Sequence, residues 1–356
     1  MTLRVLLAGG GSGGSSAPVL AVAQELRRRG ECEFLYVGTS TGPERELVES
    51  LHIPFRSVSA GKLRRYWDVQ NLLDLIRIPL GLAEAVAVVR GFRPQVAFAA
   101  GGFAAVPPLL AANLLGVPTV VHQQDVEPGL ANRILAPFAT RITVTFPSSL
   151  SHFPRHKTRM TGNPVREEVL KASPGEAGSL FGLEPGIPLV LATGGGTGAV
   201  GLNQLVAGAA PSLTPTTQLL HITGRGKSMP APAAGPRYRQ LEFLAEGMGH
   251  ALAASTLVVS RAGLSTLTEL AALGKPSILI PMPGSHQNAN AALFAREGAA
   301  LLLREAELDS ERLAGTILGL MADTARLEEM ADRARALMPL GAESRIADEI
   351  VAVARG

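Results

Sequence analysis

A glycine turn, a glutamate and a run of amide side chains give this sequence the parts of a nucleotide-binding site. Residues 261–263 read as an Arg-Ala-Gly turn, and residues 264–273 read as a helix that Gly274 ends. The start of such a helix presents unpaired N–H groups and a positive dipole end, which favour a phosphate or diphosphate. Glu269 lies about one turn into this helix, where its carboxylate can accept hydrogen bonds from both ribose hydroxyls. An alternative is that Thr266 and Glu269 form a capping box that only stabilises the helix.

A second polar cluster follows the strand predicted at residues 277–281. Residues 283–291 read Pro-Gly-Ser-His-Gln-Asn-Ala-Asn-Ala. Open α/β sheets bind ligands at the carboxyl ends of their strands, and such side chains are costly to bury without a partner. The helix with Glu269, followed by the His-Gln-x-x-Asn-Ala motif, resembles the donor site of the MurG family of bacterial glycosyltransferases. The resemblance implies donor contacts from Gly263, Leu264, Ser265, Thr266, Leu267, Thr268, Glu269, Gln287 and Asn290.

Length and composition indicate two globular domains. The chain has 356 residues, of which 46% are hydrophobic and 18% charged, so we expect two cores of about 150 to 180 residues each. Residues 96–121 carry no charge, but paired glycines and prolines break this stretch into strand, loop, helix and strand rather than a membrane span. A formal net charge of +3 gives no support to a nucleic-acid partner. The single cysteine, Cys32, and an N-terminal apolar run too short for a signal peptide predict a reducing, non-secreted location.

A strand, a glycine loop and a helix follow one another at the N-terminus. Residues 3–8 form an apolar strand, residues 9–16 are glycines and serines, and a helix extends to about Arg29, which together make an anion cradle. The loop satisfies the dinucleotide motif G-x-G-x-x-G, but the strand at 33–37 ends without an acidic residue for an adenine ribose. In the MurG family the matching loop holds the acceptor diphosphate. The resemblance therefore implies acceptor contacts from Ser12, Gly13, Gly14 and Ser15.

The same unit recurs in the second half, with a strand at 189–193, a glycine loop at 194–199 and a helix from Leu202. Two such units predict an α/β fold of the GT-B type, in which two Rossmann-like domains with parallel sheets face each other across a cleft. We expect an acceptor- and membrane-facing domain at 1–163 and a UDP-sugar domain at 164–339. A C-terminal helix at about 340–356 is expected to pack back on the first domain.

The resemblance assigns further donor contacts in the second domain. Gly196 and Thr197 belong to its glycine loop, and Leu244 lies where the backbone of the family binds uracil. Arg166 ends the pentapeptide Gly-Asn-Pro-Val-Arg, whose arginine contacts donor phosphate in the family; alternatively it only pairs with a neighbouring glutamate. The turn at 224–228, Gly-Arg-Gly-Lys-Ser, resembles the end of a P-loop but lacks the first glycine of that motif, which argues against a nucleotide triphosphatase.

Residues 62–82 mix basic and aromatic side chains, including the only tryptophan, on a predicted surface helix. Such a face suits anionic lipid headgroups, or it packs on its own domain. The resemblance implies an undecaprenyl-diphosphate-linked muramyl peptide as acceptor, which favours the membrane. It thus implies a peripheral enzyme on the cytoplasmic face of the bacterial cell membrane. The residues concerned are Lys62, Arg64, Arg65, Tyr66, Trp67 and Arg77.

The general base is where the sequence departs from the MurG motifs. Ser15 stands at the histidine of Gly-Gly-Thr-Gly-Gly-His, while Gln123 and Asp125 replace the glutamate and asparagine of His-Glu-Gln-Asn. Neither a hydroxyl nor an amide takes up a proton near neutral pH. Asp125, after the strand predicted at 118–121, is then the predicted base for the sugar C4 hydroxyl, with Glu127 and His122 as alternatives.

No D-x-D motif and no His/Cys cluster with metal-ligand spacing occurs in the sequence. The charge that develops on UDP is therefore expected to be met by helix N-termini and Arg166, without a metal or other cofactor.

The resemblance implies inverting transfer of GlcNAc from UDP-GlcNAc to lipid I, which gives lipid II. Two alternatives stay open at this point. One is a related GT-B enzyme with another acceptor, such as a glycolipid glycosyltransferase or a UDP-sugar epimerase, and the other is a degenerate homologue that binds UDP-sugar or lipid without turnover.

Overall fold

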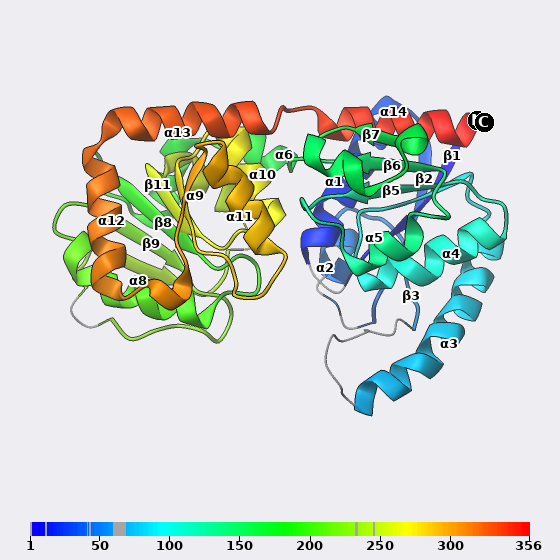
Figure 1. The fold of residues 1–356 in the computed structure, drawn as a ribbon, viewed down its shortest axis with the longest axis horizontal. Helices are drawn as coiled ribbons and strands as arrows, with labels where there is room; N and C mark the ends of the chain where they lie inside the picture. Colours follow the sequence, from blue (N-terminus) through cyan, green and yellow to red (C-terminus); the bar gives the residue numbers. More distant parts are fainter. Residues whose placement is uncertain are drawn as a thin grey trace. The chain divides into compact units, whose positions relative to one another are not determined.

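The computed structural model describes residues 2–10, 13–40, 42, 44–59, 69–231, 234–244 and 246–356, with the backbone alone at 13 and 69–78. It separates into two compact units, Met1–Pro164 with Leu340–Gly356, and Val165–Pro339. Each unit contains one parallel sheet with helices packed on it (Figure 1). The predicted fold class, an α/β fold of two Rossmann-like domains with parallel sheets, is confirmed.

The first sheet has seven parallel strands in the order β3-β2-β1-β4-β5-β6-β7. The order reverses between β1 and β4, so the loops after these two strands meet at a topological switch point. The strands are β1 (Leu3–Ala8), β2 (Cys32–Gly38), β3 (Phe55–Ser57), β4 (Val96–Ala99), β5 (Thr119–Gln123), β6 (Arg141–Val144) and β7 (Thr158–Met160). The helices are α1 (Gly13–Arg29), α2 (Glu44–Ser50), α3 (Val69–Phe92), α4 (Val106–Leu114), α5 (Leu130–Leu135) and α14 (Ala342–Arg355), with short 3-10 turns at Phe103–Ala105, Pro147–His152 and Arg155–Lys157.

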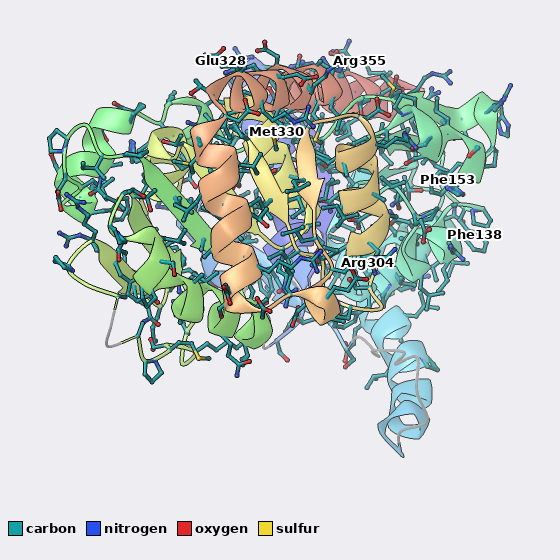
Figure 2. The ribbon with its side chains drawn as sticks, turned by 60° about the vertical axis from the view of Figure 1, so that its left-hand side comes forward. Phe138, Phe153, Arg304, Glu328, Met330 and Arg355 are labelled. Carbon is teal, nitrogen blue, oxygen red and sulfur yellow. The ribbon has the colours of Figure 1, made fainter. Side chains whose placement is uncertain are left out.

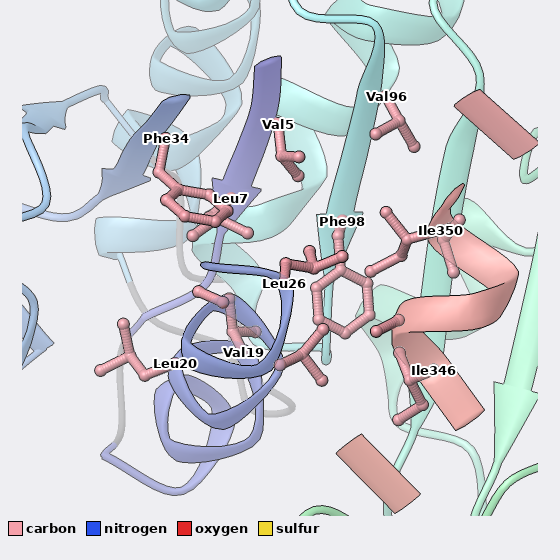
Figure 3. Packing of buried hydrophobic residues seen from close by; sticks show 14 of the residues in the cluster. Val5, Leu7, Val19, Leu20, Leu26, Phe34, Val96, Phe98, Ile346 and Ile350 are labelled. Carbon is pink, nitrogen blue, oxygen red and sulfur yellow. The ribbon is translucent and has the colours of Figure 1, made fainter. Parts of the chain in front are cut away.

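The C-terminal helix α14 completes the core of the first unit by packing against α1. Ile346 and Ile350 lie one turn apart on its buried face and contact the cluster that includes Leu26 and Phe98 (Figure 3). This spacing is that of an amphipathic helix. The strand β1 is apolar and fully buried from Val5 to Ala8 because helices cover both faces of a parallel sheet.

The second sheet has six parallel strands in the order β10-β9-β8-β11-β12-β13, with its switch point between β8 and β11. The strands are β8 (Leu189–Thr193), β9 (Gln218–Ile222), β10 (Tyr238–Leu241), β11 (Leu257–Ser260), β12 (Ser277–Leu279) and β13 (Ala300–Leu302). The helices are α6 (Glu167–Leu170), α7 (Pro174–Phe181), α8 (Val200–Leu213), α9 (Met248–Ala254), α10 (Leu264–Leu273), α11 (Gln287–Arg296), α12 (Ser310–Ala322) and α13 (Thr324–Leu337), with a 3-10 turn at Glu305–Glu307. Helix α12 packs beside α8, and α13 packs on α10 with Met330 buried and Glu328 exposed (Figure 2).

The uncharged stretch at 96–121 folds as β4, a 3-10 turn, α4 and β5, which confirms its predicted division. Within the described ranges, no helix is both long enough and apolar enough to span a bilayer.

Candidate active site

Helix α10 in the second unit has the bounds that the sequence predicts. It begins behind the turn that follows β11, with Gly263 as N-cap, and ends at Gly274, whose φ of 60° is left-handed. No side chain caps its N-terminus. The first N–H groups of a helix have no acceptor within the helix, so this end favours an anion.

Glu269 binds Arg166 and does not cap the helix, so the capping-box alternative is wrong. Its Oε1 accepts hydrogen bonds from Arg166 Nε at 2.9 Å and lies 2.7 Å from Nη2. Burial raises the pKa of the Glu269 carboxyl above its ordinary value, and the Arg166 charge opposes this shift only in part. Arg166 therefore does not fully compensate the carboxylate for its loss of water, and further hydrogen-bond donors such as ribose hydroxyls would stabilise its charged form.

Arg166 is held by two carboxylates at once. Its Nη1 contacts Glu168 Oε1 at 2.5 Å, in addition to the pair with Glu269. Burial lowers the pKa of Arg166, but the charges of Glu269 and Glu168 outweigh that effect and raise it. Arg166 thus pairs with its neighbour Glu168, as the alternative interpretation predicted, but it also pairs with Glu269 from α10. The two residues predicted to bind phosphate and ribose lie in contact in this structure.

The other predicted donor residues surround the same strand ends. The glycine loop at 194–198 follows β8, where Thr193 Oγ1 accepts the N–H of Gly195 at 3.1 Å. Gly196 and Thr197 are exposed there, ahead of α8, and Leu244 lies half-buried between β10 and α9. Their contacts with a donor stay predictions.

Gln287 and Asn290 brace the turns beside α10. Gln287 Oε1 accepts the N–H of Met282 at 3.1 Å, and Asn290, which is fully buried, donates from Nδ2 to Ala262 O at 3.3 Å. Leu267 is also fully buried, and its N–H already donates to the Gly263 carbonyl. Leu267 therefore supports the helix, and the donor contacts predicted for residues 263–268 stay predictions.

The sequence analysis did not identify Arg261, which joins the segments that follow β11, β12 and β13 in the second sheet. Its Nη1 donates to the carbonyl oxygens of Ile280 at 2.9 Å and Pro281 at 3.2 Å, and it pairs with Glu305 at 2.5 Å. The Arg261 side chain is 10% exposed. An arginine directly after a buried strand was the available signal, because a buried cation requires partners.

In the first unit, the loops after β1 and β4 meet at the switch point. Ser15 is buried, and its Oγ accepts the N–H of Gly10 at 3.3 Å. A Cβ on Gly102 would lie 2.6 Å from Gly10 O and 3.0 Å from Ser15 Oγ, so the two loops touch. Gly13 and Gly14 begin α1, whereas Ser12 lies outside the described residues. The basic and aromatic residues at 62–67 also lie outside them, and so does the side chain of Arg77.

His122 is fully buried, with both ring nitrogens engaged. Nε2 lies 2.9 Å from Asn163 Oδ1, which only accepts, so Nε2 donates and Nδ1 accepts from the Thr143 hydroxyl at 2.9 Å. Burial lowers the pKa of His122 to about 4. His122 is therefore a neutral structural residue and not the base.

Gln123 is 1% exposed and fixes the loop that carries Asp125. Its Nε2 donates to Asp125 O at 2.8 Å and to Glu127 O at 3.0 Å, while its Oε1 accepts from Asn132 Nδ2 at 2.6 Å. Neighbouring Gln124 donates to Ala100 O at 2.8 Å and joins this loop to the one after β4. Asp125 is half-buried and Glu127 exposed, and their roles in catalysis stay predictions.

The chain matches known proteins over most of its length. The glycosyltransferase family 28 N-terminal domain matches residues 5–144, and the glycosyltransferase family 28 C-terminal domain matches residues 189–348. The chain is 37% identical over 314 residues to the UDP-N-acetylglucosamine--N-acetylmuramyl-(pentapeptide) pyrophosphoryl-undecaprenol N-acetylglucosamine transferase of Lachnoclostridium phytofermentans, covering 87% of this chain and 88% of the relative. It is 36% identical to the protein of the same name from Lachnospira eligens, covering 90% and 91%.

Among solved structures, Acinetobacter baumannii MurG superposes with a TM-score of 0.76 at 25% identity, covering 99% of this chain and 100% of that one. Two parallel-sheet domains with polar side chains at the carboxyl ends of their strands, together with both domain matches, define a glycosyltransferase of the GT-B class. Within that class, the chain belongs to the MurG family.

Proposed function

We propose that this chain transfers GlcNAc, with inversion, from UDP-GlcNAc to the C4 hydroxyl of the muramyl sugar of an undecaprenyl-diphosphate-linked muramyl peptide. The observation that carries the proposal is the contact of Arg166 with Glu269 beside the start of α10. It brings a cation for phosphate and an anion for ribose to one helix N-terminus. The names of the curated relatives give the same donor, transferred sugar and lipid-linked acceptor.

When the donor binds, Arg166 and Glu269 each change partner. The diphosphate accepts hydrogen bonds from the Arg166 guanidinium and from the N–H groups at the start of α10, while the ribose hydroxyls donate to Glu269. The uracil binds the backbone near Leu244, and Gln287 contacts the sugar side of the donor. These donors stabilise the negative charge of UDP as it leaves.

The acceptor diphosphate binds the loop that opens α1, beside Gly14 and Ser15. Asp125 takes the proton of the C4 hydroxyl as its oxygen bonds to C1 of GlcNAc from the face opposite the phosphate. The bond from C1 to the phosphate oxygen breaks, and UDP leaves with the electron pair. A carboxylate suffices as base when the proton is lost late in this displacement and water is excluded.

The enzyme acts as a peripheral protein on the cytoplasmic face of the membrane, since its acceptor is lipid-linked. Exposed apolar side chains in the first unit support this location. Leu114 is 68% and Phe138 50% exposed, and Phe138 lies at the surface of the first unit (Figure 2). Asn113, the residue before Leu114, donates from Nδ2 to Phe138 O at 3.0 Å. The basic and aromatic residues at 62–67 are proposed to bind anionic lipid headgroups as well, and no nucleic acid takes part.

Transfer of radiolabel from UDP-GlcNAc to a short-chain lipid I analogue tests the reaction. Asp125→Asn should lower kcat by roughly a hundredfold or more with UDP affinity nearly intact, whereas Glu127→Gln serves as a matched control with activity retained. Full activity of Asp125→Asn would remove Asp125 as base. No transfer by the wild-type protein would refute the reaction itself.

The membrane contact is tested separately with liposomes. Trp67→Ser combined with Arg64→Ser should reduce sedimentation with vesicles that contain anionic lipid at low salt. Equal binding by the double variant would remove this segment from the contact.

A further inference from the structure

The turn at 224–228, which follows β9, has no part in the proposed reaction, yet its backbone touches the glycine loop at 194–198. A Cβ on Gly198 would lie 2.1 Å from Thr223 O, and a Cβ on Gly224 would lie 2.6 Å from Gly198 Cα. Both positions have positive φ, at 69° and 91°. Only glycine satisfies both the conformation and the close approach.

Lys227 bonds the turn to the glycine loop through its side chain. Its Nζ donates to Thr197 O at 2.8 Å and to Gly198 O at 3.3 Å. In a trans peptide the C=O and N–H groups point to opposite sides. These bonds therefore turn the carbonyl oxygens of Thr197 and Gly198 toward the lysine, and the N–H groups of Gly198 and Ala199 away from it.

The turn that carries Lys227 is itself held at both ends. Asn203, which is fully buried, donates from Nδ2 to Thr223 O at 2.8 Å and to Lys227 O at 3.1 Å. Glu242 accepts from the N–H of Gly226 at 3.1 Å and from the Ser228 hydroxyl at 3.0 Å. The Lys227 ammonium therefore extends from a fixed support toward a loop whose glycines at 195 and 198 allow its peptides to turn over.

We propose that Lys227 is a positioning residue for the donor diphosphate. It keeps two carbonyl oxygens turned out of the glycine loop, where their partial negative charge would repel the phosphates. Its ammonium also adds positive charge beside the loop. This assignment rests on the proposed function, because it takes the diphosphate of a UDP-sugar as the ligand of the loop.

The test compares UDP with uridine, since only UDP carries the phosphates. Titration calorimetry on Lys227→Met should show UDP binding weakened about tenfold or more, with uridine binding unchanged. Lys227→Arg should recover most of the loss, because it keeps a cation that donates to both carbonyl oxygens. The matched control is Arg333→Met on α13, where an exposed arginine lies 3.9 Å from Glu329, and it should bind both ligands as wild type does.

The outcomes separate this assignment from the reaction on which it rests. Wild-type affinity of Lys227→Met for UDP, or equal loss of UDP and uridine, would overturn the positioning role and leave the transferase proposal standing. A lower melting temperature of Lys227→Met without selective loss of UDP would make the lysine a purely structural clamp. A wild-type protein that binds neither UDP nor uridine would refute the reaction and the positioning role together.

Discussion

Replacing Glu269 by alanine is expected to change both the stability of the protein and its affinity for UDP, in amounts that can be separated. The variant leaves Arg166 with Glu168 as its remaining partner. Breaking a fully buried ion pair costs about 3 to 5 kcal/mol. The Arg166 side chain is 36% exposed, so solvent screening reduces the expected loss to about 1 to 2 kcal/mol.

A double-mutant cycle isolates the pair. Glu269→Ala and Arg166→Ala should each destabilise the protein, but the double variant should lose about 1 kcal/mol less than their sum, because neither charge is then left alone. Glu168→Ala is the control, since that carboxylate is 62% exposed and should cost under about 0.5 kcal/mol. Urea denaturation supplies the free energies, and additive single losses would refute the coupling.

The ligand side of the same prediction uses 2′-deoxy-UDP. If Glu269 accepts from both ribose hydroxyls, wild-type protein should bind UDP roughly tenfold more tightly than the deoxy compound. Glu269→Ala should bind UDP about 10 to 100 times more weakly than wild type and no longer distinguish the two ligands. A variant that still prefers UDP would show that the carboxylate serves the ion pair alone.

Two further predictions concern buried polar groups. Gln123→Glu should destabilise the protein by about 3 kcal/mol, because a buried carboxylate would face the two carbonyl oxygens that the amide now binds; an unchanged melting temperature would contradict this. Burial lowers the pKa of both His122 and His221 to about 4. Between pH 6.5 and 4 the unfolded chain therefore binds more protons than the folded protein does. The free energy of unfolding should fall as the pH is lowered through that window. At pH 5 each histidine should cost about 2 kcal/mol relative to pH 7, and equal unfolding free energies at pH 7 and 5 would count against neutral buried rings.

The local features of the fold were predictable because each rests on nearby residues. Glycine ends α10 at Gly274, and the apolar run at 3–8 coincides with β1. Strand β5 extends two residues beyond the predicted end, through His122 and Gln123, which pair with β6. Their polar side chains resemble a loop in sequence, but partners from later segments satisfy them.

The contacts of the site were not predictable in the same way. Arg166 and Glu269 are 103 positions apart, and no local pattern indicates that an arginine just before α6 meets a glutamate on α10. The role of Lys227 depends on the backbone contact of two glycine turns, which follows from the order of β8 and β9 in the sheet. Side-chain partners across a sheet edge are set by the tertiary fold, whereas helix ends are set by capping and turn chemistry.

The geometry around Gln123 bears on the choice of base. At this position the MurG motif has glutamate, and restoring it is the obvious route to a stronger base. In this chain the Gln123 amide donates to the carbonyl oxygens of Asp125 and Glu127 and so sets the backbone of the loop. A carboxylate has no N–H to donate, so Gln123→Glu would release the loop. In the proposed mechanism Gln123 and Asp125 therefore act together, because the Gln123 amide, which cannot serve as a base, fixes the loop that carries the proposed base Asp125.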